Sequence, residues 1–321
     1  MDVSTVSRVL RQTPDATVGV ATRERILESA SSLGYRPNLM ARGLRTARTN
    51  CRGIVVPQLD NPVFQQLILA VEETAARHGQ TTVIYHMDDQ HRPAQTIADL
   101  AAANQVDGLI IATRMIADGE LGPLKDLACP YVVINESPGT DLTVSFDYTE
   151  AARLAADHLL AMGHRRIALL NGPRGRLNAE RRLTGFNKAC DDHAIPDENR
   201  YVVEAGFGFK RGRAAMGELL ASPDRPTAIV AATLPVGIGA LAAAQNAGIN
   251  VPADLSLVAM HDALLAEMVS PHLTTVRFPI AALGEATVDS LLKILNGSKP
   301  ALPLQFKPEG IIERNSTAPP R

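Results

Sequence analysis

Hydrophobic residues follow two different spacings along the chain, and the spacing changes near residue 53. Before that point, residues 3–11 and 22–33 carry apolar positions three and four apart, the spacing of short amphipathic helices. Thr22 is the expected N-cap of the second helix, and Gly34 is a suitable residue to end it. The first part of the chain is therefore predicted to be small and all-helical.

After residue 53, short apolar runs alternate with longer amphipathic stretches. The expected strands are 53–56, 81–85, 108–112, 131–134, 143–146, 167–170, 201–205, 228–232, 255–260 and 274–277, with one or two more within 304–312. The expected helices between them are 64–78, 93–104, 149–162, 181–193, 210–221, 238–247 and 282–295. Apolar strands separated by helices predict parallel sheets covered on both faces, and two such series predict two doubly wound α/β lobes.

Charge is distributed unevenly between these parts. The formal net charge is −2, yet residues 1–52 hold nine arginines against four acidic residues, a local charge of +5. The remainder therefore carries −7. A basic head on an acidic body is typical of a DNA-binding module joined to a domain that does not bind DNA.

The bulk composition excludes several other classes. No apolar run approaches the roughly 20 residues that span a bilayer, and the N-terminus lacks the apolar core of a signal peptide. Cys51, Cys129 and Cys190 are scattered, and no pair has metal-ligand spacing. We expect a cytoplasmic, nucleoid-associated protein with reduced thiols, no bound metal and no cofactor.

Two N-terminal motifs carry a family resemblance. Residues 3–10 read VSTVSRVL, and residues 33–45 read LGYRPNLMARGLR. Together they resemble the DNA-binding headpiece of the lactose-repressor (LacI/GalR) family of bacterial transcription regulators. The resemblance implies that the first motif is a recognition helix lying in the major groove. Its implied DNA-contacting residues are Val3, Ser4, Thr5, Ser7 and Arg8, of which Arg8 best suits a guanine edge or a phosphate.

The second motif resembles the family's hinge helix. A helix of about two turns is marginal alone, so it is expected to fold only when two copies pack in the minor groove of DNA. The resemblance implies that Leu44 wedges between base steps; an ordinary packing leucine is the alternative. The implied DNA-binding residues of this segment are Asn38, Ala41, Arg42, Leu44 and Arg45.

The start of the chain affects this interpretation. In the family a complete helix and a turn precede the recognition helix, whereas here Met1 falls in the turn. The headpiece is therefore expected to be incomplete, and operator binding is conditional on a longer N-terminus.

The rest of the chain resembles the family's effector domain, which is of the periplasmic-binding-protein-like type. The matching motifs are residues 60–64, 163–167, 181–186, 271–276 and 310–316. The resemblance implies a small-molecule effector bound between the two lobes. The implied effector-binding residues are Phe64, Asn135, Arg176, Asn178, Arg182, Phe207, Thr233 and His261.

Two of these positions depart from the family pattern. Thr233 and His261 stand where the family usually has Asn and Asp, the acceptor-rich side chains that hold sugar hydroxyls. An imidazole can carry charge near neutral pH, and with Arg176 and Arg182 it makes an anionic or partly aromatic effector credible. A sugar or sugar-derived metabolite remains the first expectation.

Two other classes of protein compete with a regulator. Residues 237–242 match the dinucleotide-binding pattern GxGxxA, but they start five residues after the preceding strand rather than in its turn. A solute-binding protein for transport would share the two lobes but would need export. We expect no catalytic residues and no enzyme activity.

The sequence therefore predicts a homodimeric, ligand-responsive repressor that reads a near-palindromic operator. Its expected parts are a partial helix-turn-helix (1–35), a hinge helix and linker (36–51), an N-terminal lobe (52–148 with 279–314) and a C-terminal lobe (149–278).

Overall fold

The computed structural model describes residues 2–10, 18–35, 48–87, 93–112, 127–135 and 140–321. The chain divides into two compact units, Met1–Thr49 and Asn50–Arg321. The hinge positions 38–45, with the DNA contacts predicted for them, lie outside the described residues.

The N-terminal unit contains the two predicted helices. Helix α1 spans Val3–Leu10 and packs against α2, Val20–Ser32. Val9 and Ile26 are the buried apolar side chains of this pair. The expected N-cap was wrong: α2 is capped by Gly19, without a side-chain hydrogen bond, because the helix begins before Thr22.

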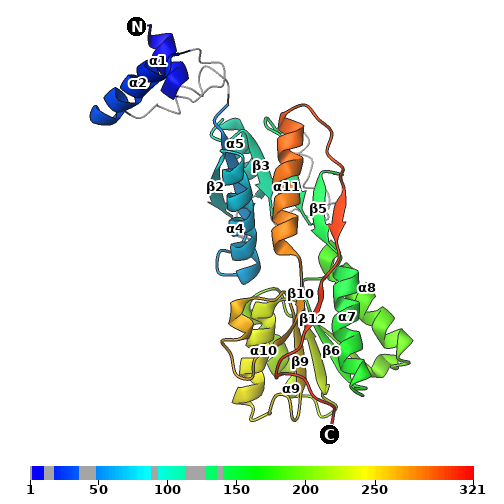
Figure 1. Ribbon diagram of the computed structural model, residues 1–321. Coiled ribbons are helices and arrows are strands. Elements are labelled where there is room, and N and C mark those ends of the chain that lie inside the picture. Colours follow the sequence, from blue (N-terminus) through cyan, green and yellow to red (C-terminus); the bar gives the residue numbers. More distant parts are fainter. Residues whose placement is uncertain (1, 11–17, 36–47, 88–92, 113–126, 136–139) are drawn as a thin grey trace. The chain divides into compact units, whose positions relative to one another are not determined.

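The first lobe of the large unit is built on a parallel sheet (Figure 1). Its order is β11-β5-β4-β3-β1-β2. The strands are β1 (Cys51–Val56), β2 (Thr81–His86), β3 (Gly108–Ile111), β4 (Tyr131–Ile134), β5 (Thr143–Phe146) and β11 (Leu304–Phe306). The helices of this lobe are α4 (Pro62–Arg77), α5 (Pro93–Ala102) and α11 (Ile280–Leu295). Helices α4 and α11 lie side by side (Figure 1).

The second lobe repeats the arrangement with the order β12-β10-β9-β8-β6-β7. Its strands are β6 (Ile167–Asn171), β7 (Arg200–Glu204), β8 (Ala228–Ala231), β9 (Ser256–Met260), β10 (Thr274–Arg277) and β12 (Gly310–Ile312). Its helices are α7 (Tyr148–Ala161), α8 (Leu177–Asp192), α9 (Phe209–Leu220) and α10 (Leu234–Asn246), with the short 3-10 turns η1 (Asp197–Asn199) and η2 (Leu264–Ala266).

Alternate residues of the apolar strands serve opposite faces of each sheet. Ile167 and Leu169 of β6 pack into a core with α7 and α8, whereas Ala168 and Leu170 pack with α9 and α10. Side chains of successive strand residues point to opposite faces, so a strand covered on both faces must be apolar throughout. The sequence-based expectation of two doubly wound lobes is confirmed.

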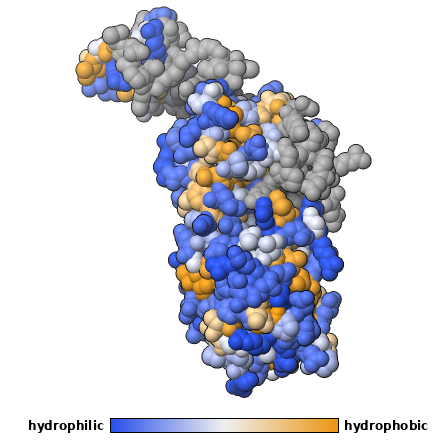
Figure 2. Space-filling view, turned by 90° about the vertical axis from the view of Figure 1, so that its right-hand side faces the viewer, coloured by the Kyte–Doolittle hydropathy of each residue, from blue (hydrophilic) through white to orange (hydrophobic). Residues whose placement is uncertain are grey.

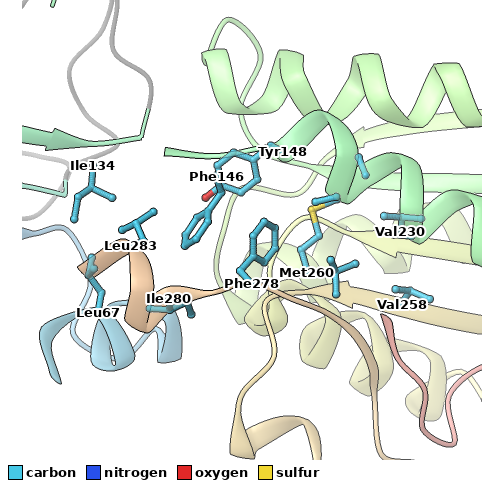
Figure 3. Packing of buried hydrophobic residues seen from close by; sticks show 14 of the residues in the cluster. Leu67, Ile134, Phe146, Tyr148, Val230, Val258, Met260, Phe278, Ile280 and Leu283 are labelled. Atoms are coloured by element: carbon cyan, nitrogen blue, oxygen red, sulfur yellow. The ribbon is translucent and has the colours of Figure 1, made fainter. Parts of the chain in front are cut away.

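The chain passes between the lobes three times within residues 140–321: between β5 and α7, between β10 and α11, and between β11 and β12. One buried core runs through these crossings, where Phe146, Tyr148 and Phe278 lie between Leu283 on one side and Met260 on the other (Figure 3). The two lobes therefore share part of their hydrophobic core.

One predicted boundary differs. Residues 279–314 were assigned to the N-terminal lobe, but β12 pairs antiparallel with β10 of the second sheet. The apolar run within 304–312 is divided: β11 completes the first sheet beside β5, and β12 crosses to the second. Because each piece is only three residues long, the apolar pattern could not show where the chain changes lobes.

Candidate effector pocket and DNA-binding helix

A pocket lies between the two lobes of the large unit. Its cavity volume is about 40 Å³, and the pocket is partly open to solvent. It is lined by side chains from both lobes: Asn61, Val63, Phe64, Leu67, Ile134, Asn135, Phe146, Tyr148, Asn178, Arg182, Phe207, Thr233, His261, Ile280 and Leu283. Ligand sites of doubly wound proteins lie at the carboxyl ends of the strands. Asn135 and His261 directly follow β4 and β9, Phe146 ends β5, and Thr233 lies just beyond the end of β8.

The first lobe contributes the N-terminal turn of α4. Asn61 is its N-cap, and the Asn61 side-chain oxygen accepts a hydrogen bond from the Val63 amide at 3.2 Å. Pro62 occupies the first helical turn, where its missing N–H is harmless. This local arrangement fixes the start of α4, so that Val63 and Phe64 reach the pocket from the first turn.

Asn135 and His261 take up the same position in the two lobes. Each directly follows a strand, β4 or β9, and each has a positive φ, 77° for Asn135 and 70° for His261. Asn and His adopt this left-handed conformation more often than most non-glycine residues, and where it costs about 1–3 kcal/mol it clusters at functional sites. The Tyr148 hydroxyl donates to the Asn135 side-chain oxygen at 3.3 Å.

Aromatic rings form one wall of the pocket. His261 stacks on Phe278, with 4.5 Å between ring centroids, and meets Phe146 and Tyr148 edge-on at 6.0 and 5.9 Å. Phe146 belongs to the first lobe, His261 to the second, and Phe278 to the segment that connects β10 of the second lobe with α11 of the first. A change in the angle between the lobes would therefore rearrange the wall of the pocket.

His261 is uncharged in this environment. Burial, and secondly the nearby positive charge of Arg182, lower its pKa from 6.5 to about 3. Its Nδ1 atom is buried and makes no hydrogen bond within the described chain. This low pKa disfavours, near neutral pH, the charged imidazole that the sequence suggested.

Arg182 is the cation of the pocket lining, and it is 2 % exposed. Its guanidinium lies 4.2 Å from the centre of the Tyr148 ring and 5.9 Å from that of Phe207, within cation–π range. One amino group donates to the Asn178 carbonyl at 3.3 Å, while Nε is buried without a partner. Burial lowers the pKa of this guanidinium, and no carboxylate of the described residues is paired with it.

Phe207 and Thr233 are held against each other. The Thr233 hydroxyl donates to the Phe207 carbonyl at 3.0 Å and accepts from the Val236 amide at 3.3 Å, which caps α10. Gly172 makes room for the Phe207 ring, since a Cβ at Gly172 would come within 2.5 Å of it. The threonine that stands in place of an expected asparagine is thus engaged in holding the local structure.

Seven of the eight implied effector residues line the pocket: Phe64, Asn135, Asn178, Arg182, Phe207, Thr233 and His261. Arg176 is not among the lining residues; it occupies the N-cap position of α8, and its Nη1 is buried without a hydrogen-bond partner in the described chain. Sequence reasoning missed Phe146 and Tyr148, aromatic residues that end β5 and begin α7.

The dinucleotide-like pattern at 237–242 lies inside α10. Pro235 and the Thr233 cap start this helix earlier than expected, so the glycines are not in a turn after a strand. A Cβ at Gly239 would come within 2.3 Å of the Phe209 carbonyl of α9. Gly239 therefore serves the close packing of α10 on α9, and Gly237 the packing of α10 on Ala259 of β9, rather than the phosphate contact that such a fingerprint requires.

The candidate recognition helix is α1. Arg8 is exposed on it, whereas its neighbour Val9 is fully buried against α2. Thr5 is partly exposed, and the side chains of Val3, Ser4 and Ser7 are not described. The remaining implied DNA contacts, Asn38, Ala41, Arg42, Leu44 and Arg45, belong to the segment outside the described residues.

The described part of the chain also bears on metal binding and on membrane insertion. No cluster of three His, Cys, Asp or Glu side chains in it could hold a metal ion. None of its helices is long and apolar enough to cross a membrane. Hydrophilic residues cover much of the face drawn in Figure 2, with hydrophobic residues in separate patches between them.

Fold and pocket together define a small helical unit joined to a two-lobed ligand-binding unit. Comparison with known families agrees: residues 2–38 match the model for bacterial regulatory proteins of the lacI family, and residues 156–317 match a periplasmic binding protein-like domain.

Individual relatives cover nearly the whole chain. The HTH-type transcriptional repressor CytR of Escherichia coli K12 is 32% identical over 300 residues, 92% of this chain and 87% of CytR. The lac repressor dimer bound to operator and the anti-inducer ONPF has a TM-score of 0.85 at 27% identity, over 98% of this chain and 95% of that one. A LacI family regulator from Enterococcus faecium with bound ribose has a TM-score of 0.74 at 28% identity, over 84% and 99%. The chain belongs to the LacI family of bacterial regulatory proteins.

Proposed function

We propose that this protein is a transcriptional repressor whose affinity for operator DNA is set by a small metabolite bound between its lobes. One observation carries the proposal: a helical unit matched by the lacI-family model occurs in the same chain as an inter-lobe pocket. The repressor CytR and the operator-bound lac repressor support the DNA-binding half. The ribose-bound regulator supports a sugar or related metabolite as the effector.

The pocket explains how an effector acts on the lobes. Phe64 and Asn135 approach from the first lobe, and Arg182, Phe207 and His261 approach from the second. A ligand that touches both groups favours one angle between the lobes. It changes operator affinity only by the difference between its affinities for the DNA-binding and the released states.

The DNA contacts are assigned to α1 and to the hinge segment. Arg8 and Thr5 suit base and phosphate contacts, and Val3, Ser4 and Ser7 belong to the same helix. In the hinge segment, Leu44 acts as the wedge between base steps, and Asn38, Ala41, Arg42 and Arg45 flank it. The protein acts in the cytoplasm, where its operator lies.

The repressor is proposed to act as a homodimer on a near-palindromic operator. The solved dimer of the lac repressor supports this arrangement. Exposed large apolar side chains on both lobes are available for a subunit contact, Leu69 and Ile84 on the first and Leu264 and Met268 on the second. Charged substitutions at Leu69 and Met268 are expected to give a monomer by sedimentation analysis, with effector binding retained.

Operator binding is tested by selecting a preferred duplex from a random pool and measuring affinity by fluorescence anisotropy. Affinity should fall steeply as salt rises, because phosphate contacts release counterions. Arg8→Ala should weaken binding about tenfold or more. The matched control is Arg77→Ala, since Arg77 is an exposed arginine of the large unit, paired with Glu285; it should leave DNA affinity unchanged.

A solute-binding protein is the second candidate, because it would share the two lobes and the pocket. It would bind its ligand but show no sequence-selected duplex. Ligand binding together with no retention on DNA at about 0.15 M salt would favour that function over a repressor.

A further inference from the structure

The charge inside the pocket is unbalanced. None of the lining residues is Asp or Glu, while one of them, Arg182, carries a full positive charge. Burying a guanidinium without a counterion is costly, and natural proteins normally pair such a group with an anion. The pocket therefore contains one more positive charge than it neutralises.

Aromatic rings hold this charge in place without cancelling it. The guanidinium of Arg182 lies between the Tyr148 and Phe207 rings at 4.2 and 5.9 Å from their centres. Cation–π attraction of this kind is much weaker than the cost of desolvating an isolated ion. The buried, unpartnered Nε leaves a hydrogen-bond donor for a ligand at this place.

Several other polar groups of the lining are engaged with the protein, whereas His261 Nδ1 is buried without a partner in the described chain. The Asn61 side-chain oxygen caps α4, the Asn135 oxygen accepts from Tyr148, and the Thr233 hydroxyl both donates and accepts. The second basic group, His261, is neutral. The lining thus offers one charged donor group, no carboxylate to accept from hydroxyl groups, and broad aromatic and aliphatic surfaces.

We propose that the effector is a compact monocarboxylate whose carboxylate pairs with Arg182 and whose ring packs on the aromatic wall of the pocket, rather than a neutral sugar. The single cation matches one negative charge and not the two of a phosphate monoester. A carboxylate accepts two parallel hydrogen bonds from a guanidinium, which also orients the ring. This inference rests on the proposed function of the pocket as the effector site.

Two matched pairs of compounds test the charge and the kind of ring separately. Glucuronate and glucose share a sugar ring, and benzoate and benzamide share an aromatic ring; in each pair only the first is an anion. Binding to the full-length protein is measured by calorimetry. The acid of at least one pair should bind about tenfold or more tightly than its neutral partner, and the pair in which this occurs identifies the ring as sugar or aromatic.

Arg182→Gln should remove the preference for the acid, so that acid and neutral partner bind within about twofold of each other. Arg181→Gln, the neighbouring and exposed arginine of α8, is the control and should keep the preference. Thermal unfolding of both variants without ligand checks that they fold. If Arg182→Gln does not fold, the affinities of the wild-type protein for each acid and its neutral partner still test whether the pocket prefers a carboxylate.

Two outcomes overturn the inference. One is a neutral member that binds as tightly as its acid, and the other is no binding of either acid at about 10 mM. Operator affinity, measured without effector, is independent of both outcomes. If a neutral compound binds the pocket best and operator binding is intact, only the carboxylate inference is wrong. If the protein does not bind operator DNA, the proposed repressor function is wrong.

Discussion

Single residues decide the electrostatics of the pocket, and His261 is the clearest case. Burial holds its pKa at about 3, far below the ordinary 6.5. Between these values the unfolded chain binds a proton that the folded protein does not. The contribution of His261 to stability is therefore complete above about pH 6.5 and is lost as the pH falls toward 3.

His261→Asn is expected to make the melting temperature less sensitive to acid between about pH 7 and pH 4. Asparagine keeps the positive φ and a hydrogen-bonding side chain but does not titrate. His158 and His164, whose pKa values are also lowered chiefly by burial, retain part of the slope. The exposed His272 provides the control in His272→Asn. An unchanged acid sensitivity in His261→Asn would contradict this account.

Gly172 sets the position of an aromatic ring in the same pocket. Gly172→Ala would bring a methyl group within 2.5 Å of the Phe207 ring tip, so the ring must move. The ring is at the end of a rotatable side chain, and the cost to folding should stay near 1 kcal/mol. We expect effector affinity to fall about tenfold with little change in melting temperature. If the melting temperature falls strongly along with the effector affinity, the substitution acts on folding rather than on the pocket.

At the scale of elements, the close packing of α9 on α10 depends on glycine. A Cβ at Gly239 would meet the Phe209 carbonyl at 2.3 Å, and backbone cannot move aside as a side chain can. Gly239→Ala is therefore expected to destabilise the protein by about 2–4 kcal/mol, measured by urea unfolding. Gly217→Ala on α9 is the matched control: nothing lies within 4 Å of its added Cβ, so helix propensity should make it neutral or slightly stabilising.

Most elements could be predicted from sequence because their pattern is local. Each central strand is an apolar run, and turn residues such as Gly34 mark helix ends. Helix starts were less accurate: α10 was expected at residue 238 but begins at Leu234, because the Thr233 cap and Pro235 start it within an apolar stretch. The sequence did not show which lobe β12 joins, because its pairing with β10 forms only in the folded chain.

The pocket was predicted mainly through family resemblance, which is carried by motifs. Phe64 and Arg182 fall in such motifs, Phe207 was implied by the same resemblance, and all three line the pocket. Arg176 lies six residues before Arg182, at the N-cap of α8, but is not a lining residue, because residues near a helix start point in different directions. Tyr148 was missed since a buried aromatic at the start of a helix looks the same in sequence whether it lines a pocket or fills a core.

At the scale of the whole molecule, a side chain of the first lobe makes a hydrogen bond to the backbone of the second lobe. The Gln66 side-chain amide of α4 donates to the Asp262 carbonyl at 2.9 Å. Asp262 is itself fixed by Thr275, Arg277 and Arg314, and these contacts outweigh the effect of its burial and lower its pKa. The contact therefore joins α4 to a firmly held part of the second lobe.

Gln66→Ala should weaken effector binding about fivefold, the value of one neutral hydrogen bond, because the arrangement that encloses the ligand loses a contact. The neighbouring Gln65 also donates to a carbonyl, that of Leu59, but within its own lobe. Gln65→Ala is therefore the control, and it should leave affinity unchanged by calorimetry. Equal effects of the two variants would show that Gln66 does not act between the lobes.

The three passages of the chain between the lobes have one more consequence. Near Asp147, Phe278 and Lys307 the lobes are tied by covalent bonds that can twist but cannot lengthen. Because all three connections are short, the lobes cannot move apart. The movement that remains is a rotation of one lobe relative to the other. A rotation set by a metabolite at the pocket would then move the far ends of the lobes further than the residues beside the pocket.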